Sequence, residues 1–379
     1  MAERCHDRRH GDPPAGAEAR PHLLPAAADQ LAGITAAASQ AWPAFALITG
    51  LLLVGVVAER DGLFAAAGGQ ISRLPFPPRA LLLASLGLVA VVTAVLNLDT
   101  SVFFLTPVML HLARHRGLDE TPFLYGTVFM SNAASLFLPG SNLTNLIVLH
   151  HERVPGATFF SRMWPAAFAA VLTTALVLLV MFWRALGKPA GDERDAIGAR
   201  LGVGAVAVAL STVLVLVLAA PALPVLVCGV AAVLLARSSR DRVLAAVNPR
   251  VIGGLFVLAV AVGSAGRWWH GPEHLINSYG RWQTAVAGAA GSVGLNNLPA
   301  AMLFAAHPPM HPRALLIGLN LGPNLAVTGS LSAVLWLRVA RGLDARPSIR
   351  TYSLLGIVLV PVSLAAALAA LWLTAPGRL

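Results

Sequence analysis

Long, nearly uncharged apolar runs recur along most of the chain, and they restrict its fold more than any other feature. A helix needs about 20 mostly apolar residues to cross a bilayer. Charged residues make up 12% of the sequence, against about 25% in an ordinary soluble domain, and 57% are hydrophobic. The runs cover residues 42–58, 80–110, 121–149, 164–183, 201–236, 251–266, 282–306, 314–337 and 351–375. Because helices satisfy their own backbone polar groups in lipid, the sequence predicts an all-α polytopic membrane protein.

The net charge of +10 also fits a membrane protein. Most of the 27 Lys and Arg residues fall in five predicted loops, at residues 59–79, 114–120, 184–200, 237–250 and 338–350. Cytoplasmic loops of membrane proteins are enriched in Lys and Arg. We therefore expect these loops in the cytoplasm and the chain in the inner (plasma) membrane as a multi-pass protein. The expected partner is the lipid bilayer, and no nucleic acid is expected.

Two apolar runs are interrupted by polar residues near their middle, which predicts re-entrant hairpins. The first hairpin, residues 80–113, has Asn97, Asp99 and Thr100 at its tip. The second hairpin, residues 282–306, has Asn296 and Asn297. Polar tips expose backbone N–H groups, which membrane proteins tolerate only around a protein-lined cavity. If each hairpin enters and leaves the membrane on the same face, the five basic loops lie on one side of the membrane. The two hairpins then open to opposite faces of the membrane.

A second interrupted helix follows each hairpin. Pro139-Gly140 interrupts residues 121–150, and Gly322-Pro323 interrupts residues 313–338. Proline inside a helix removes a hydrogen bond and breaks or kinks it. The breaks bring more polar side chains to the predicted cavity, and with the hairpin tips they form the predicted substrate-binding set: Asn97, Thr100, Ser141, Asn142, Thr144, Asn145, Asn296, Asn297, Asn320, Asn324, Thr328 and Ser330.

Two hairpin-and-broken-helix units in one chain indicate a duplication with inverted topology. We predict a first transporter repeat at residues 41–200 and a second at residues 201–379. Residues 1–40 begin with a polar stretch rich in Pro and Gly, and they are expected to form a disordered tail followed by a surface helix or the remnant of a span.

Asp99 is the one acid placed in the middle of an apolar run, since every other Asp and Glu falls in a predicted loop. A charged side chain at the bilayer centre costs about 2.5–3.5 kcal/mol on insertion scales, so an intramembrane carboxylate is by default a functional candidate. We predict that Asp99 couples transport to protons. The alternative is an acid that only binds a neighbouring helix end.

The spacing of the histidines is only weak evidence for a metal site. His111/His115, His270/His274 and His307/His311 are each four residues apart, but prolines interrupt the second and third pairs. Neither catalytic motifs nor a phosphate-binding loop occur, and the two cysteines cannot form a metal site. We expect no enzyme activity, no metal and no cofactor, with transport driven by a proton gradient or by sodium.

Four stretches closely resemble the arsenite/antimonite efflux permeases: NLDTSVFFLTPV, SNAASLFLPGSNLTNL, GLNNLPA and LNLGPNLAVTGSLSAVLWLR. This arsenical pump membrane protein family belongs to the ion transporter superfamily, with citrate and dicarboxylate carriers. The resemblance runs from about Trp42 to the C-terminus. It implies opposed hairpins, elevator-like movement against a scaffold, and export of arsenite or antimonite in exchange for protons. It places Asp99 where these permeases have the acid of the first hairpin.

The substrate class stays open between two chemistries. A trivalent arsenic hydroxide presents three hydroxyls, which suit a ring of Asn, Ser and Thr groups. Helix N-termini could equally hold a carboxylate, which makes an ion-coupled citrate or dicarboxylate transporter the alternative. The family likeness allows a homodimer and a soluble ATPase subunit as partners, although nothing in the sequence indicates the ATPase.

Overall fold

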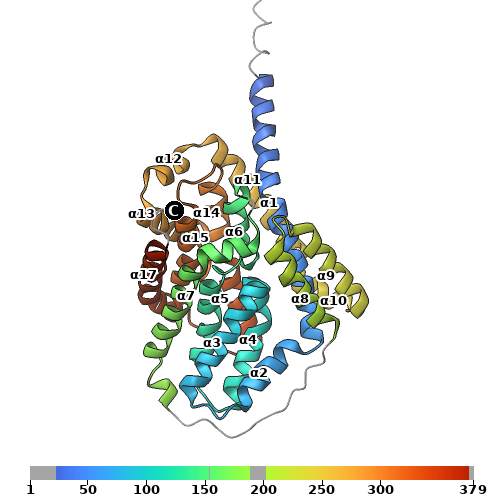
Figure 1. The fold of residues 1–379 in the computed structure, drawn as a ribbon, viewed down its shortest axis with the longest axis vertical. Coiled ribbons are helices and arrows are strands. Elements are labelled where there is room, and N and C mark those ends of the chain that lie inside the picture. The colour runs from blue at the N-terminus through green and yellow to red at the C-terminus, as the bar shows by residue number, and fades with distance from the viewer. Residues whose placement is uncertain (1–22, 153, 188–201, 375–379) are drawn as a thin grey trace, which may run out of the picture.

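The computed structural model describes residues 23–152, 154–187 and 202–374, and all regular secondary structure in these ranges is helical (Figure 1). The first half contains α1 (Leu23–Arg60), α2 (Leu63–Arg73), α3 (Pro78–Val95), α4 (Leu98–His115), α5 (Glu120–Ala134), η1 (Pro139–Ser141), α6 (Leu143–Val148), η2 (Leu149–His151), α7 (Gly156–Met181) and η3 (Ala185–Gly187). The second half contains α8 (Val203–Val217), α9 (Ala222–Ala236), α10 (Arg240–Val247), α11 (Pro249–Trp268), α12 (Gly271–Ser278), α13 (Arg281–Leu295), α14 (Asn297–Phe304), α15 (Pro312–Leu321), η4 (Gly322–Leu325), η5 (Val327–Gly329), α16 (Leu331–Gly342) and α17 (Ile349–Thr374).

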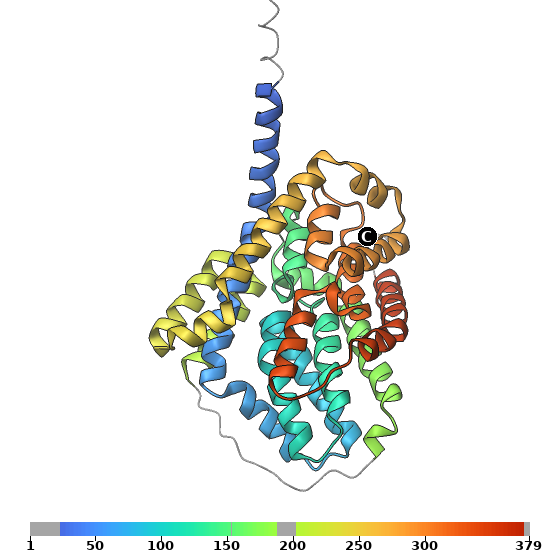
Figure 2. The same cartoon turned by 180° about the vertical axis from the view of Figure 1, so that it is seen from behind.

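Helix α1, with 38 residues, is the longest helix in the described residues, and several helices pack along one side of it. It packs against α8, α9 and α11, and Figures 1 and 2 show α8, α9 and α10 beside it, away from the hairpins. A Cβ on Gly50 would lie 2.7 Å from the backbone of Leu226, so glycine lets α1 and α9 cross closely. Residues 23–40 continue into the following span as one helix, because α1 runs through them without interruption. Residues 1–22 lie outside the described part.

The first hairpin consists of α3 and α4. Pro78 opens α3, where its missing N–H costs nothing, and Asn97 caps α4. The second hairpin consists of α13 and the shorter α14, joined at Asn296, whose φ of 81° lies in the left-handed region that Asn tolerates better than most residues. In Figure 1 the first hairpin occupies the lower half of the molecule and the second the upper half.

The two broken helices pass between the hairpins. Helices α5 and α6 are separated by η1, and α15 and α16 by η4 and η5. Helix α4 packs against α16, and α14 packs against α6, so the second arm of each hairpin contacts the broken helix of the other half. The predicted fold class is confirmed: an all-α polytopic membrane protein with two inverted repeats, each containing a re-entrant hairpin and a broken transmembrane helix. The division at residue 200 falls in 188–201, outside the described residues.

Among the described residues, five helices are long and apolar enough to cross a membrane: Gln30–Arg60, Pro78–Val95, Gly156–Met181, Arg240–Trp268 and Ile349–Thr374. Helices α8 and α9 have 15 residues each, about 22 Å at 1.5 Å per residue, against a hydrocarbon core of about 30 Å. The apolar run 201–236 therefore contains two helices, each shorter than the hydrocarbon core is thick.

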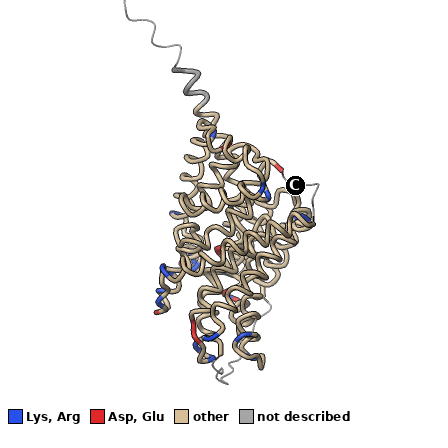
Figure 3. The backbone as a smooth tube through the Cα atoms, turned by 90° about the vertical axis from the view of Figure 1, so that its left-hand side faces the viewer, with Lys and Arg blue, Asp and Glu red and all other residues tan. Residues whose placement is uncertain are grey.

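The outer surface of the helices is apolar, as lipid contact requires. Large hydrophobic side chains are exposed along α7, α8, α9, α11 and α17. In Figure 3, segments with Lys or Arg lie at the lower end, in a group on the left at mid-height and at a few places in the upper part. The cytoplasmic position of the five basic loops stays a prediction.

Candidate functional site

Four helices begin at predicted substrate-binding residues, and each is capped by one of them. Asn and Ser are favoured there because the side-chain oxygen accepts an otherwise unpaired N–H. The caps are Asn97 on α4 (2.7 Å to the Thr100 N), Asn142 on α6 (3.2 Å to the Thr144 N), Asn296 on α14 (3.2 Å to the Leu298 N) and Ser330 on α16 (3.1 Å to the Ala333 N). The partly positive ends of four helices are thus set at the two tips and the two breaks.

Asn320, in the last turn of α15, is the centre of a buried hydrogen-bond network that joins the two broken helices. Its Oδ1 accepts from Ser135 Oγ and, at 2.7 Å, from Asn142 Nδ2. Its Nδ2 donates to Asn145 Oδ1 at 2.8 Å. Asn145 in turn donates to the Ser135 carbonyl at 2.7 Å. The breaks of the two repeats are therefore held together by amides and a hydroxyl.

A second set of hydrogen bonds joins the two broken helices in the same region, and it starts from an amide at the end of α5 in the first repeat. Asn132, in the last turn of α5, donates from Nδ2 to Asn324 Oδ1 at 2.7 Å. Asn324 is fully buried, and its Nδ2 donates to the Phe129 carbonyl at 3.4 Å. Asn132 holds the position in α5 that Asn320 holds in α15. Each repeat thus contributes an amide from the equivalent position, although the partners of Asn132 and Asn320 are not equivalent.

Asp99 lies in the first turn of α4, and Ser332 Oγ donates to its Oδ1 at 2.6 Å. Asp99 also lines a cavity of about 100 Å³. The other lining residues are mostly apolar side chains of α1, α11 and α16, together with Asn248 and Arg338 from the loops expected in the cytoplasm. The carboxylate of Asp99 therefore accepts a hydrogen bond from the Ser332 hydroxyl on one side and borders a mostly apolar cavity on the other.

The equivalent position in the second hairpin carries no acid. Leu298 occupies in α14 the place that Asp99 occupies in α4, and Thr144 occupies in α6 the place of Ser332 in α16. Helices α6 and α14 pack together as α4 and α16 do. In the described part of the chain, only the first hairpin thus presents a carboxylate to the second half of a broken helix.

Several buried polar atoms at the site have no hydrogen-bond partner within the described residues: Asn97 Nδ2, Thr100 Oγ1, Asn132 Oδ1 and Thr144 Oγ1. A buried polar group without a partner costs about 1–3 kcal/mol, so such atoms are rare unless a ligand or water meets them. They include an amide donor, an amide acceptor and two hydroxyls that can act as either.

The structure connects the remaining predicted residues in different ways. Ser141 Oγ donates to the Ala94 carbonyl at 3.1 Å, joining the first break to the first hairpin. Asn296 Nδ2 donates to the Thr328 carbonyl at 2.9 Å, joining the second tip to the second break. The Thr328 side chain is exposed, whereas Asn297 is buried. The central amides bond to one another, and their lining of a substrate cavity stays a prediction.

Sequence reasoning did not select three members of the site, Asn132, Ser135 and Ser332. Asn132 could have been found from its place in the first repeat, which matches that of Asn320 in the second. Ser135 and Ser332 give no local signal, because their partners Asn320 and Asp99 lie 185 and 233 residues away.

Opposed hairpins, two broken helices and a buried polar crossing define a multi-pass membrane transporter rather than an enzyme. The chain belongs to the CitMHS family, described as citrate transporter, which matches residues 21–337. The fold is shared with the YdaH transporter of Alcanivorax borkumensis, whose crystal structure has an unusual topology. That likeness has a TM-score of 0.58 at 14% identity and covers 94% of this chain and 90% of the YdaH chain.

Curated relatives fall in the same transporter group. An arsenical pump membrane protein of Escherichia coli is 26% identical over 371 residues, covering 87% of this chain and 86% of its own length. An uncharacterized transporter of Mycobacterium tuberculosis is 25% identical over 380 residues, covering 88% of this chain and 86% of its own length.

Proposed function

We propose that this protein is a secondary active transporter of the inner membrane that exports arsenite or antimonite in exchange for protons. The observation that carries the proposal is the buried network of neutral amides and hydroxyls around Asn320, with the single carboxylate of Asp99 beside it. The relative named as an arsenical pump membrane protein supports the substrate.

The chemistry of the network suits a neutral polar solute. Arsenic(III) hydroxide carries three hydroxyls, each a donor and an acceptor, and Asn side chains offer both kinds of group. In the described part of the chain the only cysteine is Cys228 on α9, whose Sγ accepts from Ser211 Oγ at 3.5 Å, outside the polar crossing. A thiolate would bind arsenic covalently and slow its release, so a site of amides and hydroxyls fits transit.

Asp99 is suited to carry the coupling proton. Its carboxylate is within reach of the Ser332 hydroxyl and of the cavity that extends to Asn248 and Arg338. A second cavity, of about 400 Å³, lies between α1, Pro139 of the first break and the α8–α9 loop. With the basic loops in the cytoplasm, the cavity at Asp99 lies towards the cytoplasmic side, and a movement of the hairpin would have to bring Asp99 to the opposite side for the proton to be exchanged there.

An ion-coupled carboxylate transporter is the second candidate, with sodium or protons as the driving ion. The family description as citrate transporter favours it, as do the four capped helix N-termini, whose N–H groups attract oxyanions. Against it, Asp99 would repel an anionic substrate unless a cation or a proton accompanied it.

Transport by the purified protein in liposomes separates the two candidates. Arsenite, antimonite, citrate and succinate are supplied in turn, with an imposed proton gradient and then an imposed sodium gradient. We expect arsenite and antimonite to accumulate against their gradients with protons alone. Uptake of citrate or succinate without arsenite would replace the first candidate by the second. Ser332→Ala should slow the proton-driven transport, while the exposed matched change Ser278→Ala should not.

A further inference from the structure

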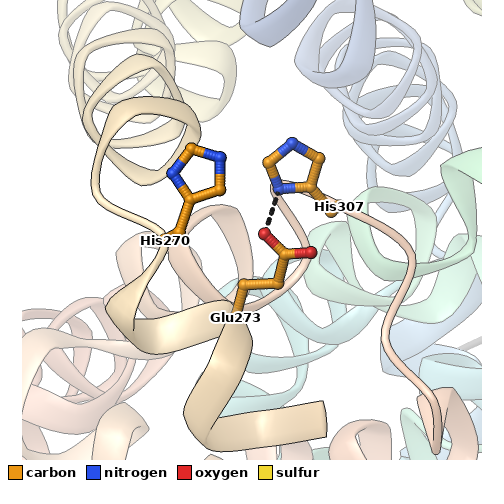
Figure 4. Close-up of side chains that lie close together, drawn as sticks. All are labelled: His270, Glu273 and His307. Carbon is orange, nitrogen blue, oxygen red and sulfur yellow. Dashed lines mark ion pairs between the residues drawn. The ribbon is translucent and has the colours of Figure 1, made fainter.

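Three chemically reactive side chains meet at a place that the transport function does not use: His270, Glu273 and His307 (Figure 4). Their ligand atoms all lie within 4.8 Å of one another. His307 Nδ1 lies 2.7 Å from Glu273 Oε2, and the rings of His270 and His307 stack with centroids 5.6 Å apart. Figure 4 shows both imidazoles and the carboxylate directed towards a common point.

Local backbone structure fixes this arrangement. His270 is the residue before α12, and Glu273 lies in the first turn of that helix, so a Gly271-Pro272 pair separates them and places them on one side of the helix start. Acidic residues are favoured in the first turn by the helix dipole. His307 follows α14 and precedes Pro308-Pro309, which restrict its backbone.

We propose that His270, Glu273 and His307 form a site for Zn²⁺ or a similar divalent transition metal, with water completing the coordination. Two imidazole nitrogens and one carboxylate oxygen with an open fourth position are a common zinc ligand set. Ideal tetrahedral ligands lie roughly 3.3 Å apart at metal–ligand distances of 2.0–2.1 Å, so small side-chain rotations complete the site. Imidazole ligands select transition metals over Mg²⁺ and Ca²⁺.

A simple ion pair between Glu273 and His307 is the competing explanation. It does not account for His270, which stacks on His307 with an interplanar angle of 22°. A metal ion between the three groups would bring one nitrogen of each imidazole and the carboxylate together.

Positive charge near the cluster opposes a bound cation and limits its affinity. Arg267 is the nearest fixed positive side chain on the same segment, and its guanidinium donates to Gln40 Oε1 at 2.9 Å and to the Gly263 carbonyl at 2.8 Å. Burial, followed by the charges of Arg267 and His307, lowers the pKa of His151. His274 is exposed, with its ring centroid 6.5 Å from that of His270. Because Arg267 opposes a metal ion, micromolar rather than nanomolar affinity is expected.

Metal binding would join two parts of the transporter. His270 lies between α11 and α12, Glu273 lies in the first turn of α12, and α11 packs on α1. His307 belongs to the outer end of the second hairpin. An ion held between them ties the hairpin to α11 and α12, so it should slow any movement of the hairpin relative to α1. The binding itself does not depend on the proposed substrate.

Zinc binding to the purified full-length protein tests the proposal, by competition with a chromophoric chelator and by the visible absorption of bound Co²⁺. The affinity tag must contain no histidines, and the N-terminal Cys5, His6 and His10 remain in every variant as a constant background. Each of His270→Ala, Glu273→Gln and His307→Ala should weaken the site at least about tenfold, since even outer-shell changes cost 10–100-fold. The neighbouring histidines give matched controls, and His274→Ala and His311→Ala should change the affinity less than about twofold.

Thermal unfolding without metal must show that the variants remain folded, and zinc should raise the unfolding temperature of the wild type but not of His307→Ala. Equal zinc affinity in the wild type and His270→Ala would overturn the proposal. So would an equally large loss in His274→Ala. Because binding is measured without transport, failure here leaves the proposed export function untouched, and a failed export assay leaves the metal site untouched.

Discussion

Asn320→Ala should lower the free energy of unfolding by about 2–5 kcal/mol. The change removes the partner of Asn142, Asn145 and Ser135, all buried at the crossing. Hydrogen bonds between membrane helices average about 0.6 kcal/mol and reach about 1.7 kcal/mol, and three of them are lost. The amides left behind have no water to replace their partner, so the upper half of the range is expected.

A double-mutant cycle isolates one of these bonds. Asn142→Ala and the double variant with Asn320→Ala are unfolded with sodium dodecyl sulfate in mixed micelles, and tryptophan fluorescence follows the loss of structure. The bond of 2.7 Å between the two amides predicts a coupling energy of about 0.6–1.7 kcal/mol. Ser278→Ala, on the exposed face of α12, should show no coupling to Asn320→Ala beyond about 0.3 kcal/mol. Additive effects of Asn142→Ala and Asn320→Ala would refute the network.

Three further predictions concern packing, a polar contact and orientation. Gly318→Ala should destabilise the protein by about 1–3 kcal/mol, because the new methyl would collide with the backbone of α13. In Gly87→Ala the new methyl meets no atom within 4 Å, so this variant should be more stable than the wild type by up to about 1 kcal/mol. Thermal unfolding compares the two variants. Gln40→Leu should lower the free energy of unfolding by about 1–3 kcal/mol, because Gln40 Nε2 donates to the Ile147 carbonyl at 3.1 Å and to the Ala305 carbonyl at 2.7 Å. An unchanged unfolding temperature would argue against these hydrogen bonds. In a background without the two native cysteines, an impermeant thiol reagent on intact cells should label a cysteine at Ser278 but not one at Ser239, and the opposite pattern would reverse the orientation.

Local features of the sequence predict the hairpins and breaks well. Helix α15 ends at Leu321, directly before Gly322-Pro323, because proline cannot continue the backbone hydrogen bonds, whereas α5 ends at Ala134, five residues before Pro139. Asn97, Asn142, Asn296 and Ser330 were selected as polar residues at interruptions, and all four cap the following helix. Capping depends on neighbouring residues only, so a sequence reveals it.

Contacts between distant segments are not encoded locally. The pairing of Asn132 with Asn324 joins residues 192 apart, and Ser332 reaches Asp99 over 233 residues. The histidines show the same limit. Their spacing of four paired His270 with His274 and offered no carboxylate partner, whereas the structure places Glu273 beside His307 and His270 against both. Helical periodicity cannot anticipate contacts made by the packing of separate hairpins.

Proton-driven transport by Asp99→Asn tests the central claim most directly. Wild type, Asp99→Asn and the matched change Asp119→Asn, which keeps a helix cap on α5, are reconstituted into liposomes, and arsenite accumulation under a proton gradient is compared with arsenite exchange without one. Asn keeps the size of the side chain but cannot release a proton. We predict that Asp99→Asn loses accumulation but retains exchange, and that Asp119→Asn retains both. Accumulation by Asp99→Asn at the wild-type level would contradict the account, because proton coupling would then lie elsewhere.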